Sequence, residues 1–286
     1  MSSNRLTHLL KSLAGDLTRP DGHPYTSLSF SAECRIAGET GQSLREVEIL
    51  ALEQNIIPER YCRNQTSLSN EDQKKLLQAH VAIVGLGGLG GTVTEILARI
   101  GVGRLTLIDG DCFDESNLNR QLLSNPGNLG KAKAEIAAER VKTINPAIQT
   151  YPAETFFNSE NGRELLHSVD LVVDCLDTIP DRFTVESTCQ TLSLPLVSAA
   201  IGGSCGQATA VLPGDPGLKL IYGIPRKAPA KGVEATIGTL PFAAIYMAAV
   251  ECAETVAILI GRSPGLQNRL FLADIMEHTS ELVDFS

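Results

Sequence analysis

The chain has 286 residues, of which 43% are hydrophobic and 20% are charged, and its formal net charge at pH 7 is -9. This length and composition are typical of a globular protein with one substantial core, with or without a small appendage. The acidic balance argues against a surface that coats nucleic acid, which needs an excess of Lys and Arg. The seven cysteines form no C-x-x-C pair and the first residues do not resemble a signal peptide. We therefore expect a cytoplasmic protein without a nucleic-acid partner.

Residues 1–57 differ from the rest and are predicted to form a small helical appendage. The segment 18–27 is dense in Pro, Gly and Asp, which predicts a loop. Two short helices are expected at 31–37 and 44–54. The second should begin after Ser43, which has a glutamate three residues later, the spacing of a capping box.

The spacing of this helix pair also matches a helix-turn-helix. Binding to DNA depends on basic residues that contact phosphates, and only Arg35 and Arg45 lie near the pair. A helical appendage that docks on the main domain or on a partner is therefore the better interpretation.

From residue 80 onward, short apolar runs alternate with stretches of helical periodicity. The expected strands are 80–85, 104–109, 148–153, 169–175, 195–201, 207–212 and 270–275. The expected helices are 88–100, 131–144, 181–192 and 239–260. This alternation predicts an α/β fold in which residues 58–286 form a Rossmann-like, doubly wound, mostly parallel sheet with helices on both faces.

The helix expected at 239–260 is apolar enough to suggest a membrane span. It contains Pro241, Glu251 and Glu254, however, and one charged residue at mid-bilayer costs roughly 2.5–3.5 kcal/mol. We therefore predict a buried or dimer-facing helix and no membrane association.

A glycine-rich loop follows the first of these strands. Gly85, Gly87, Gly88 and Gly90 stand between a predicted strand and a predicted helix, where the backbone can approach phosphates and free N–H groups receive their charge. Asp109 ends the next strand, where a carboxylate can bind ribose hydroxyls. Taken alone, this fingerprint favours an NAD(P)-binding Rossmann oxidoreductase, which stays open as an alternative.

Further polar motifs do not belong to a hydride-transfer enzyme. In chain order they are RYCRN at 60–64, DGD at 109–111, SNLNRQ at 116–121, GKAK at 130–133 and DCLD at 174–177. Scattered cations together with a carboxylate predict a site for a nucleoside triphosphate and Mg²⁺.

In this order the motifs resemble those of the ThiF/MoeB/HesA adenylyltransferases, bacterial relatives of ubiquitin-activating enzymes, over about residues 60–201. The resemblance implies ATP-dependent adenylation of the C-terminal Gly-Gly carboxylate of a small ubiquitin-like sulfur-carrier protein of the MoaD or ThiS type. The pathway would be molybdopterin, tungstopterin or thiamine biosynthesis. Two alternatives stay open: a non-catalytic relative, and a family member that adenylates a small molecule, a peptide or a tRNA base.

The resemblance also implies roles for individual residues. Arg120 and Lys133 would contact phosphates and Asp177 would hold Mg²⁺, while Lys131 matches the motif less well than Lys133. Arg63 would reach into the neighbouring subunit's site, which implies a homodimer. The other nucleotide contacts would be Gly85, Gly87, Gly88, Gly90, Asp109, Asp111, Asn117 and Gln121.

The sequence departs from the family pattern in two places. Many relatives hold zinc with two C-x-x-C pairs, but the C-terminal third here has only Cys205 and Cys252, so no zinc is expected. The loop 223–238, which would cross over the carrier's tail, contains no cysteine. We therefore expect adenylation without a covalent bond between enzyme and carrier. Lys227 and Lys231 in this loop suggest that it faces an acidic carrier.

Overall fold

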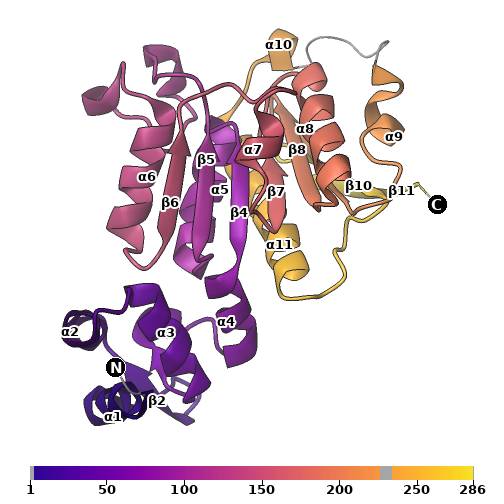
Figure 1. The fold of residues 1–286 in the computed structure, drawn as a ribbon. Helices are drawn as coiled ribbons and strands as arrows, with labels where there is room; N and C mark the ends of the chain where they lie inside the picture. The colour runs from indigo at the N-terminus through magenta and orange to yellow at the C-terminus, as the bar shows by residue number, and fades with distance from the viewer. Residues whose placement is uncertain (1–2, 226–233, 286) are drawn as a thin grey trace.

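The computed structural model describes residues 3–225 and 234–285. Figure 1 shows two parts, a small N-terminal unit and a larger α/β domain, which α4 (Asn70–Gln78) connects. The larger domain is built on an eight-stranded sheet with the strand order β11-β10-β9-β8-β7-β4-β5-β6. The N-terminal unit has its own sheet with the order β1-β2-β3.

Five neighbouring strands of the large sheet run parallel, which confirms the predicted doubly wound architecture. They are β8 (Leu196–Gly202), β7 (Leu171–Asp174), β4 (His80–Val84), β5 (Arg104–Ile108) and β6 (Gln149–Ala153). Three strands extend the sheet in alternating directions: β9 (Cys205–Val211), β10 (Arg269–Asp274) and β11 (Thr279–Asp284). The strand β11 has no counterpart among the strands predicted from the sequence.

Helices cover both faces of the sheet, and the alternation of side chains along β4 shows why. Val81 and Ile83 belong to a core with one group of helices, whereas Ala82 and Val84 belong to a second core on the other face. The first group consists of α5 (Gly88–Ile100), α6 (Lys133–Ile144) and α11 (Pro241–Leu259). The second group consists of α7 (Gly162–Leu165) and α8 (Ile179–Leu192). Two further helices, α9 (Lys219–Tyr222) and α10 (Glu234–Ile237), have four residues each.

The strand order reverses at β4. The next strand along the chain, β5, pairs with one side of β4, and β7 pairs with its other side. The segments that follow β4 and β7 therefore lead away from each other at the carboxyl ends of these strands. In open α/β sheets this is where the crevice that binds ligands forms.

The N-terminal unit is not only helical, which corrects the prediction. It consists of α1 (Ser3–Leu13), β1 (Gly15–Thr18), β2 (Pro24–Leu28), α2 (Phe30–Thr40), α3 (Leu44–Glu53) and β3 (Ile57–Pro58). The segment 18–27 is a hairpin whose turn residues occupy only the tip, where Gly22 has φ +85°. Tyr25 and Ser27 lie in β2, and the hydroxyls of both donate to the carboxylate of Glu59.

Arg35 and Arg45, the two arginines near the helix pair with helix-turn-helix spacing, both form contacts within the chain. Arg35 forms an ion pair with Glu39 on its own helix, at 2.7 Å. Arg45 donates to the backbone carbonyl of Gly103 in the larger domain, at 3.4 Å. These contacts favour a docked appendage over a DNA-binding surface. The predicted capping box at the start of α3, formed by Ser43 and Glu46, is confirmed.

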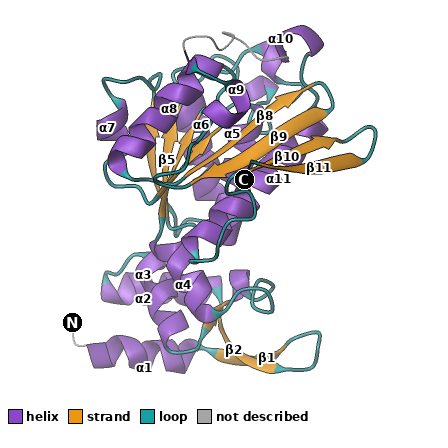
Figure 2. Cartoon of the chain, turned by 90° about the vertical axis from the view of Figure 1, so that its right-hand side faces the viewer, coloured by secondary structure: helices purple, strands orange, loops and turns teal. Residues whose placement is uncertain are grey.

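A buried tyrosine joins the two parts. The Tyr61 hydroxyl donates to Glu48 Oε2 at 3.2 Å and accepts from Asn145 Nδ2 at 2.8 Å. Its ring lies so close to Gly101 that a Cβ there would meet ring atoms at 2.7 Å. Gly101 and Asn145 end α5 and α6, so the N-terminal unit sits at the amino-terminal edge of the parallel strands, opposite the crevice (Figure 2).

Among the described residues, α11 is the one helix that is long and apolar enough to cross a membrane by length and composition. In the folded chain it packs against α5 and the sheet, and its Met247 and Cys252 belong to the first core. Glu251 on the same helix is fully buried. One side of the helix is thus buried in the core, while Phe242, Ile245 and Tyr246 are exposed, so the prediction of a buried or dimer-facing helix stays open between its two forms.

The N-terminal unit should lose stability as the pH rises, because burial raises the pKa of Glu33 from 4.5 to about 7. The unfolded chain then releases this proton first, so the free energy of unfolding should fall by about 3 kcal/mol between pH 4.5 and pH 7. Glu33→Gln should make this decline smaller in urea unfolding followed by circular dichroism, while Glu48, whose pKa burial raises to about 8, still contributes a decline of its own. Glu39→Gln, an exposed change on the same helix, is the control. Equal pH slopes for wild type and Glu33→Gln would contradict the prediction.

Candidate active site

The glycine loop is tightly wound between β4 and α5. Gly85 has φ +87°, and a Cβ on it would lie 2.9 Å from the carbonyl oxygen of Cys175 at the end of β7. A Cβ on Gly90 would lie 1.8 Å from the carbonyl oxygen of Gly85. The missing side chains let the loop close on itself and leave the first N–H groups of α5 open to an anion.

Asp109, at the end of β5, binds the backbone of the glycine loop. Its Oδ2 accepts from the N–H of Leu86 at 2.7 Å and its Oδ1 from the N–H of Asp111 at 2.8 Å. Each carboxylate oxygen keeps a further lone pair, so the group can still accept from ribose hydroxyls. Burial raises the pKa of Asp109, and the positive charge of Lys133 opposes this shift.

Lys133 joins this cluster. Its ammonium lies 3.0 Å from Asp111 Oδ2 and is almost entirely buried. The helix α6 begins at this residue and not at Lys131, because the backbone of 131–133 pairs with that of 111–113 and stays extended. Lys131 is exposed and outside the cluster. Lys133 and not Lys131 therefore belongs to the cluster beside the glycine loop, and its contact with phosphate stays a prediction.

The segment 116–121 covers the glycine loop from the other side. A Cβ added to Gly88 would lie 3.4 Å from the carbonyl oxygen of Arg120. A Cβ added to Gly87 would lie 3.6 Å from Gln121 Nε2. Asn117 is buried and caps its own turn through the N–H of Asp114. Gln121 Oε1 is buried without a hydrogen-bond partner in the described part of the chain. An unpartnered buried acceptor beside a glycine loop is suited to bind a ligand donor.

The DCLD motif divides into a buried and an exposed carboxylate. Asp174 is fully buried, and its Oδ2 lies 3.0 Å from Arg182 and 2.7 Å from the Ser198 hydroxyl. Arg182 also donates to the carbonyl oxygen of Leu176, one residue before Asp177. Asp177 itself is exposed and has no side-chain partner among the described residues. Arg182 is therefore a positioning residue that holds the loop presenting Asp177.

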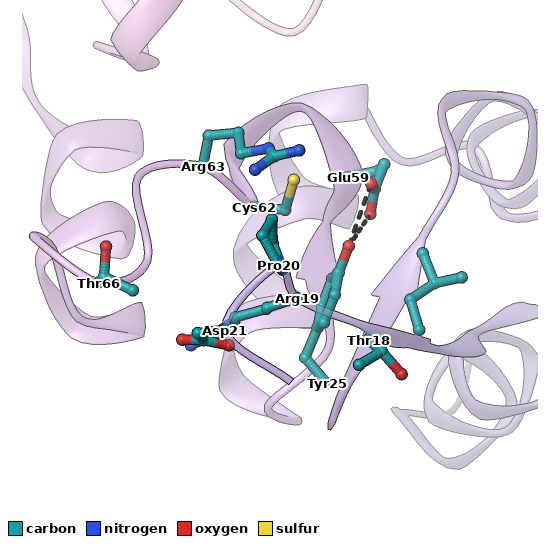
Figure 3. A pocket seen from close by; sticks show the side chains of 10 residues that line it. Thr18, Arg19, Pro20, Asp21, Tyr25, Glu59, Cys62, Arg63 and Thr66 are labelled. Atoms are coloured by element: carbon teal, nitrogen blue, oxygen red, sulfur yellow. Dashed lines mark hydrogen bonds between the residues drawn. The ribbon is translucent and has the colours of Figure 1, made fainter. Parts of the chain in front are cut away.

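Arg63 does not join this cluster within one chain. It lies in the N-terminal unit, at the amino-terminal edge of the sheet, where it lines a hollow with Arg19, Tyr25 and Glu59 (Figure 3). The glycine loop follows the carboxyl end of β4, at the opposite edge. A contact between Arg63 and a nucleotide on this loop would have to be made by a second copy of the chain.

One candidate residue, Phe156, was not predicted from the sequence. Its side chain is 65% exposed, and its ring lies against Gly110, where a Cβ would meet ring atoms at 2.8 Å. Asn161 Nδ2 donates to the Phe156 carbonyl oxygen at 2.9 Å and fixes the backbone there. An exposed ring beside Asp109 can stack on a nucleobase. The available signal was an aromatic pair directly after the strand expected at 148–153.

The loop 226–233, with Lys227 and Lys231, lies outside the described residues. In the described part of the predicted carrier-facing segment, Ile224 and Ile237 are exposed. The role proposed for the lysines stays a prediction, as does the absence of zinc.

A glycine loop with a carboxylate and a buried lysine beside it, at the switch point of a doubly wound sheet, is the arrangement of a nucleotide-binding α/β protein. The family model described as "ThiF family" matches residues 61–285, and the chain belongs to this family. It is an adenylyltransferase, as its relatives are named, and the oxidoreductase alternative is set aside.

Three curated relatives illustrate the range of the family. The chain is 33% identical over 232 residues to the SAMP-activating enzyme E1 of Haloferax volcanii, covering 79% of this chain and 85% of that protein. It is 33% identical over 216 residues to a sulfur carrier protein adenylyltransferase of Thermus thermophilus, covering 72% and 79%. It is 39% identical over 134 residues to a tRNA threonylcarbamoyladenosine dehydratase of Haemophilus influenzae, covering 46% and 51%.

Solved structures share the fold. PaaA aligns with a TM-score of 0.66 at 18% identity and covers 96% of this chain and 99% of its own, so the N-terminal unit is included. E. coli MccB with AMPCPP and MccA aligns with a TM-score of 0.65 at 25% identity, covering 79% of this chain and 71% of its own.

Gly90→Ala should abolish ATP binding and lower the melting temperature, because the new Cβ cannot fit 1.8 Å from a backbone carbonyl oxygen. Gly38→Ala is the matched control: it lies in α2 with open space around the new Cβ, and should stabilise the fold by about 0.5–1 kcal/mol. Titration calorimetry and thermal unfolding measure both. ATP binding of wild-type strength by Gly90→Ala would show that the loop does not cradle the phosphates.

Phe156→Ala should weaken ATP and AMP binding by the same factor, about tenfold, because the ring is expected to contact the base that both nucleotides share. Arg120→Ala should weaken ATP binding more than AMP binding, since this arginine is expected to contact the phosphates. Met276→Ala, at a side chain 64% exposed in the turn between β10 and β11, is the control. A loss by Phe156→Ala that depends on the number of phosphates would contradict the stacking role.

Proposed function

We propose that the chain uses ATP to adenylate the C-terminal Gly-Gly carboxylate of a ubiquitin-like sulfur-carrier protein of the MoaD or ThiS type. The observation that carries the proposal is the 33% identity to two enzymes named for activating such carriers, over most of each chain. The activated carrier would then receive sulfur for molybdopterin, tungstopterin or thiamine biosynthesis. The expected location is the cytoplasm.

The chemistry follows from charge. A C-terminal carboxylate has a reference pKa of about 3.5, so it is ionised at pH 7 and needs no general base. Its oxygen attacks the α-phosphorus, the bond from that phosphorus to the bridging oxygen breaks, and pyrophosphate leaves with the electron pair. The obstacle is the approach of one anion to another. Arg120 and Lys133 would reduce this repulsion and stabilise the leaving group.

Lys133 can contact a phosphate only after its ion pair with Asp111 has broken. In the present structure it is paired with Asp111, whose side chain is 56% exposed. A triphosphate would offer this ammonium a more highly charged partner, and the exposed Asp111 could turn to solvent at little cost. Asp111 would thus keep the lysine in place before the nucleotide binds.

Asp177 fits the Mg²⁺ that the reaction would use. Mg²⁺ is commonly bound by one or two protein carboxylates together with substrate phosphates and water. Asp177 offers such a carboxylate, exposed and unpartnered among the described residues, on the loop that follows β7. When bound, the ion would supply charge neutralisation of the phosphates, while Asp174 and Arg182 keep the loop in place.

The active form proposed here is a homodimer. Arg63 lies at the edge of the sheet opposite to its own glycine loop, so it can contribute only to the site of a second copy. The position supports the exchange of arginines between subunits that the resemblance implies.

A second candidate is adenylation of a peptide carboxylate. E. coli MccB, solved with the adenine nucleotide AMPCPP and with MccA, shares the fold at 25% identity, and PaaA aligns over the N-terminal unit as well. A panel of acceptors that contains both carriers and free peptides separates the two. Adenylation of a tRNA base, a further alternative, is supported by an alignment over 46% of the chain. The net charge of -9 does not favour binding to a nucleic acid.

Asp177→Ala should reduce carrier-dependent ATP–pyrophosphate exchange by about a hundredfold or more, because the metal that neutralises the phosphates loses its protein ligand. Glu164→Ala, an exposed change on α7, is the control. The intact mass of each carrier should increase by one adenylyl group with wild type and not with Asp177→Ala. If no carrier ending in Gly-Gly gains this mass with wild type, the proposed substrate is wrong.

A further inference from the structure

The hollow on the N-terminal unit contributes only Arg63 to the function proposed so far. Its volume is about 580 Å³, and it lies between the hairpin of β1 and β2 and the residues that follow β3. Figure 3 shows that Arg19 comes from the tip of the hairpin and Arg63 from the segment on the other side. Two arginines from separate elements thus line one concave surface.

The acidic groups of the hollow are already engaged. The Glu59 carboxylate accepts from the hydroxyls of Tyr25 and Ser27. Asp21 lies 3.3 Å from His23 Nδ1, and the same carboxylate accepts from the His23 N–H.

The two arginines, in contrast, form no ion pair among the described residues, although the pKa of Asp21 is lowered by the hydrogen bond from the His23 N–H and also by the charge of Arg19. The Arg19 guanidinium lies over the Tyr25 ring at 5.5 Å, and its buried Nε has no hydrogen-bond partner. Arg63 is exposed and forms no ion pair or side-chain hydrogen bond within the described ranges. Arginine forks suit phosphate oxygens, which can accept two parallel hydrogen bonds. The hollow is therefore suited to bind an anionic group that none of the described residues supplies.

The anion must belong to another molecule. The chain's own nucleotide loop lies at the carboxyl edge of the sheet, whereas the hollow lies at the amino edge with Tyr61 and Gly101. Exposed apolar side chains occur at both places: Leu17 is 45% exposed in the hollow, and Leu118 and Leu122 beside the glycine loop are 37% and 50% exposed. A second copy that brings these surfaces together would set the two arginines against a nucleotide.

We propose that Arg19 acts together with Arg63 in trans, so that the N-terminal unit of one subunit supplies two arginines to the triphosphate bound by its partner. This inference rests on the proposed function and its homodimer, and it adds the hairpin to the active site. Arg19 lies before residue 61, where the match to the family begins. The pair would balance the charge of pyrophosphate as the bond between its bridging oxygen and the α-phosphorus breaks.

The first test compares single variants in carrier-dependent ATP–pyrophosphate exchange. Arg19→Gln should lower the rate by about ten- to a hundredfold, and Arg19→Lys by less, because lysine keeps the charge but not the fork. Arg35→Ala, an exposed arginine of the same unit outside the hollow, should leave the rate unchanged. Thermal unfolding of all variants within a few degrees of wild type excludes a folding defect.

The decisive test mixes two inactive chains. Arg19→Gln and Asp177→Ala, refolded together in equal amounts, should give mixed dimers with one intact site, so that about a quarter of the wild-type rate returns. Arg63→Ala mixed with Asp177→Ala should behave in the same way. Lys133→Ala mixed with Asp177→Ala should give no recovery, because both residues belong to the site of their own chain.

The outcomes separate the two proposals. Recovery by the Arg63 pair but not by the Arg19 pair, or a wild-type rate for Arg19→Gln, overturns the role of Arg19 and leaves the proposed function intact. If wild type shows no exchange with any carrier, the proposed function fails, and Mg·ATP binding decides the inference instead. Unchanged Mg·ATP affinity of Arg19→Gln then overturns it, and a loss restored in mixed dimers supports it.

Discussion

The ion pair between Asp174 and Arg182 is the interaction on which the geometry of the candidate site depends. It lies in the interior, and Arg182 also donates to the carbonyl oxygens of Leu176 and Ala199, so that one guanidinium connects β7, β8 and the loop leading to Asp177. Removing one partner of such a pair leaves an uncompensated buried charge, which commonly costs about 3–5 kcal/mol. Glu251 lies nearby, and burial together with the negative charge of Asp174 raises the pKa of its carboxyl well above the usual value.

The position of the N-terminal unit imposes a second constraint. Tyr61 fastens it to the ends of α5 and α6, far from the nucleotide loop of the same chain. Any catalytic contribution of this unit must therefore be made between molecules. The rigid attachment through a buried hydrogen-bonded tyrosine would hold such a contribution at a defined distance, which a flexible linker would not.

The sequence predicted the fold well where local signals and tertiary structure agree. The helix expected at 88–100 has the observed bounds, because glycine loop residues precede it and Gly101 ends it in a left-handed conformation. The start of α6 was placed two residues early, since the pairing of 131–133 with 111–113 is a long-range contact that local periodicity does not record. The hairpin of β1 and β2 was missed because its turn residues dominate a short segment.

The site was predictable to a similar degree and for a similar reason. Residues fixed by ordered motifs, such as Asp109 and Lys133, come together at the switch point as expected. The sequence could not show that Lys133 is paired with Asp111, that Arg182 braces the DCLD loop, or that Phe156 stands exposed beside Gly110. These facts depend on contacts between strands that are distant along the chain.

The outermost strand β11 has a consequence for the behaviour of the protein in solution. Its outer side pairs with no other strand among the described residues, and an open strand of this kind can recruit a strand from another molecule. Glu281 and Asp284 place negative charge along this border, and Asp284 is held by Arg269 at 3.4 Å. If two such edge strands approached each other, their negative charges would repel. The charges on β11 therefore oppose aggregation through this edge of the sheet.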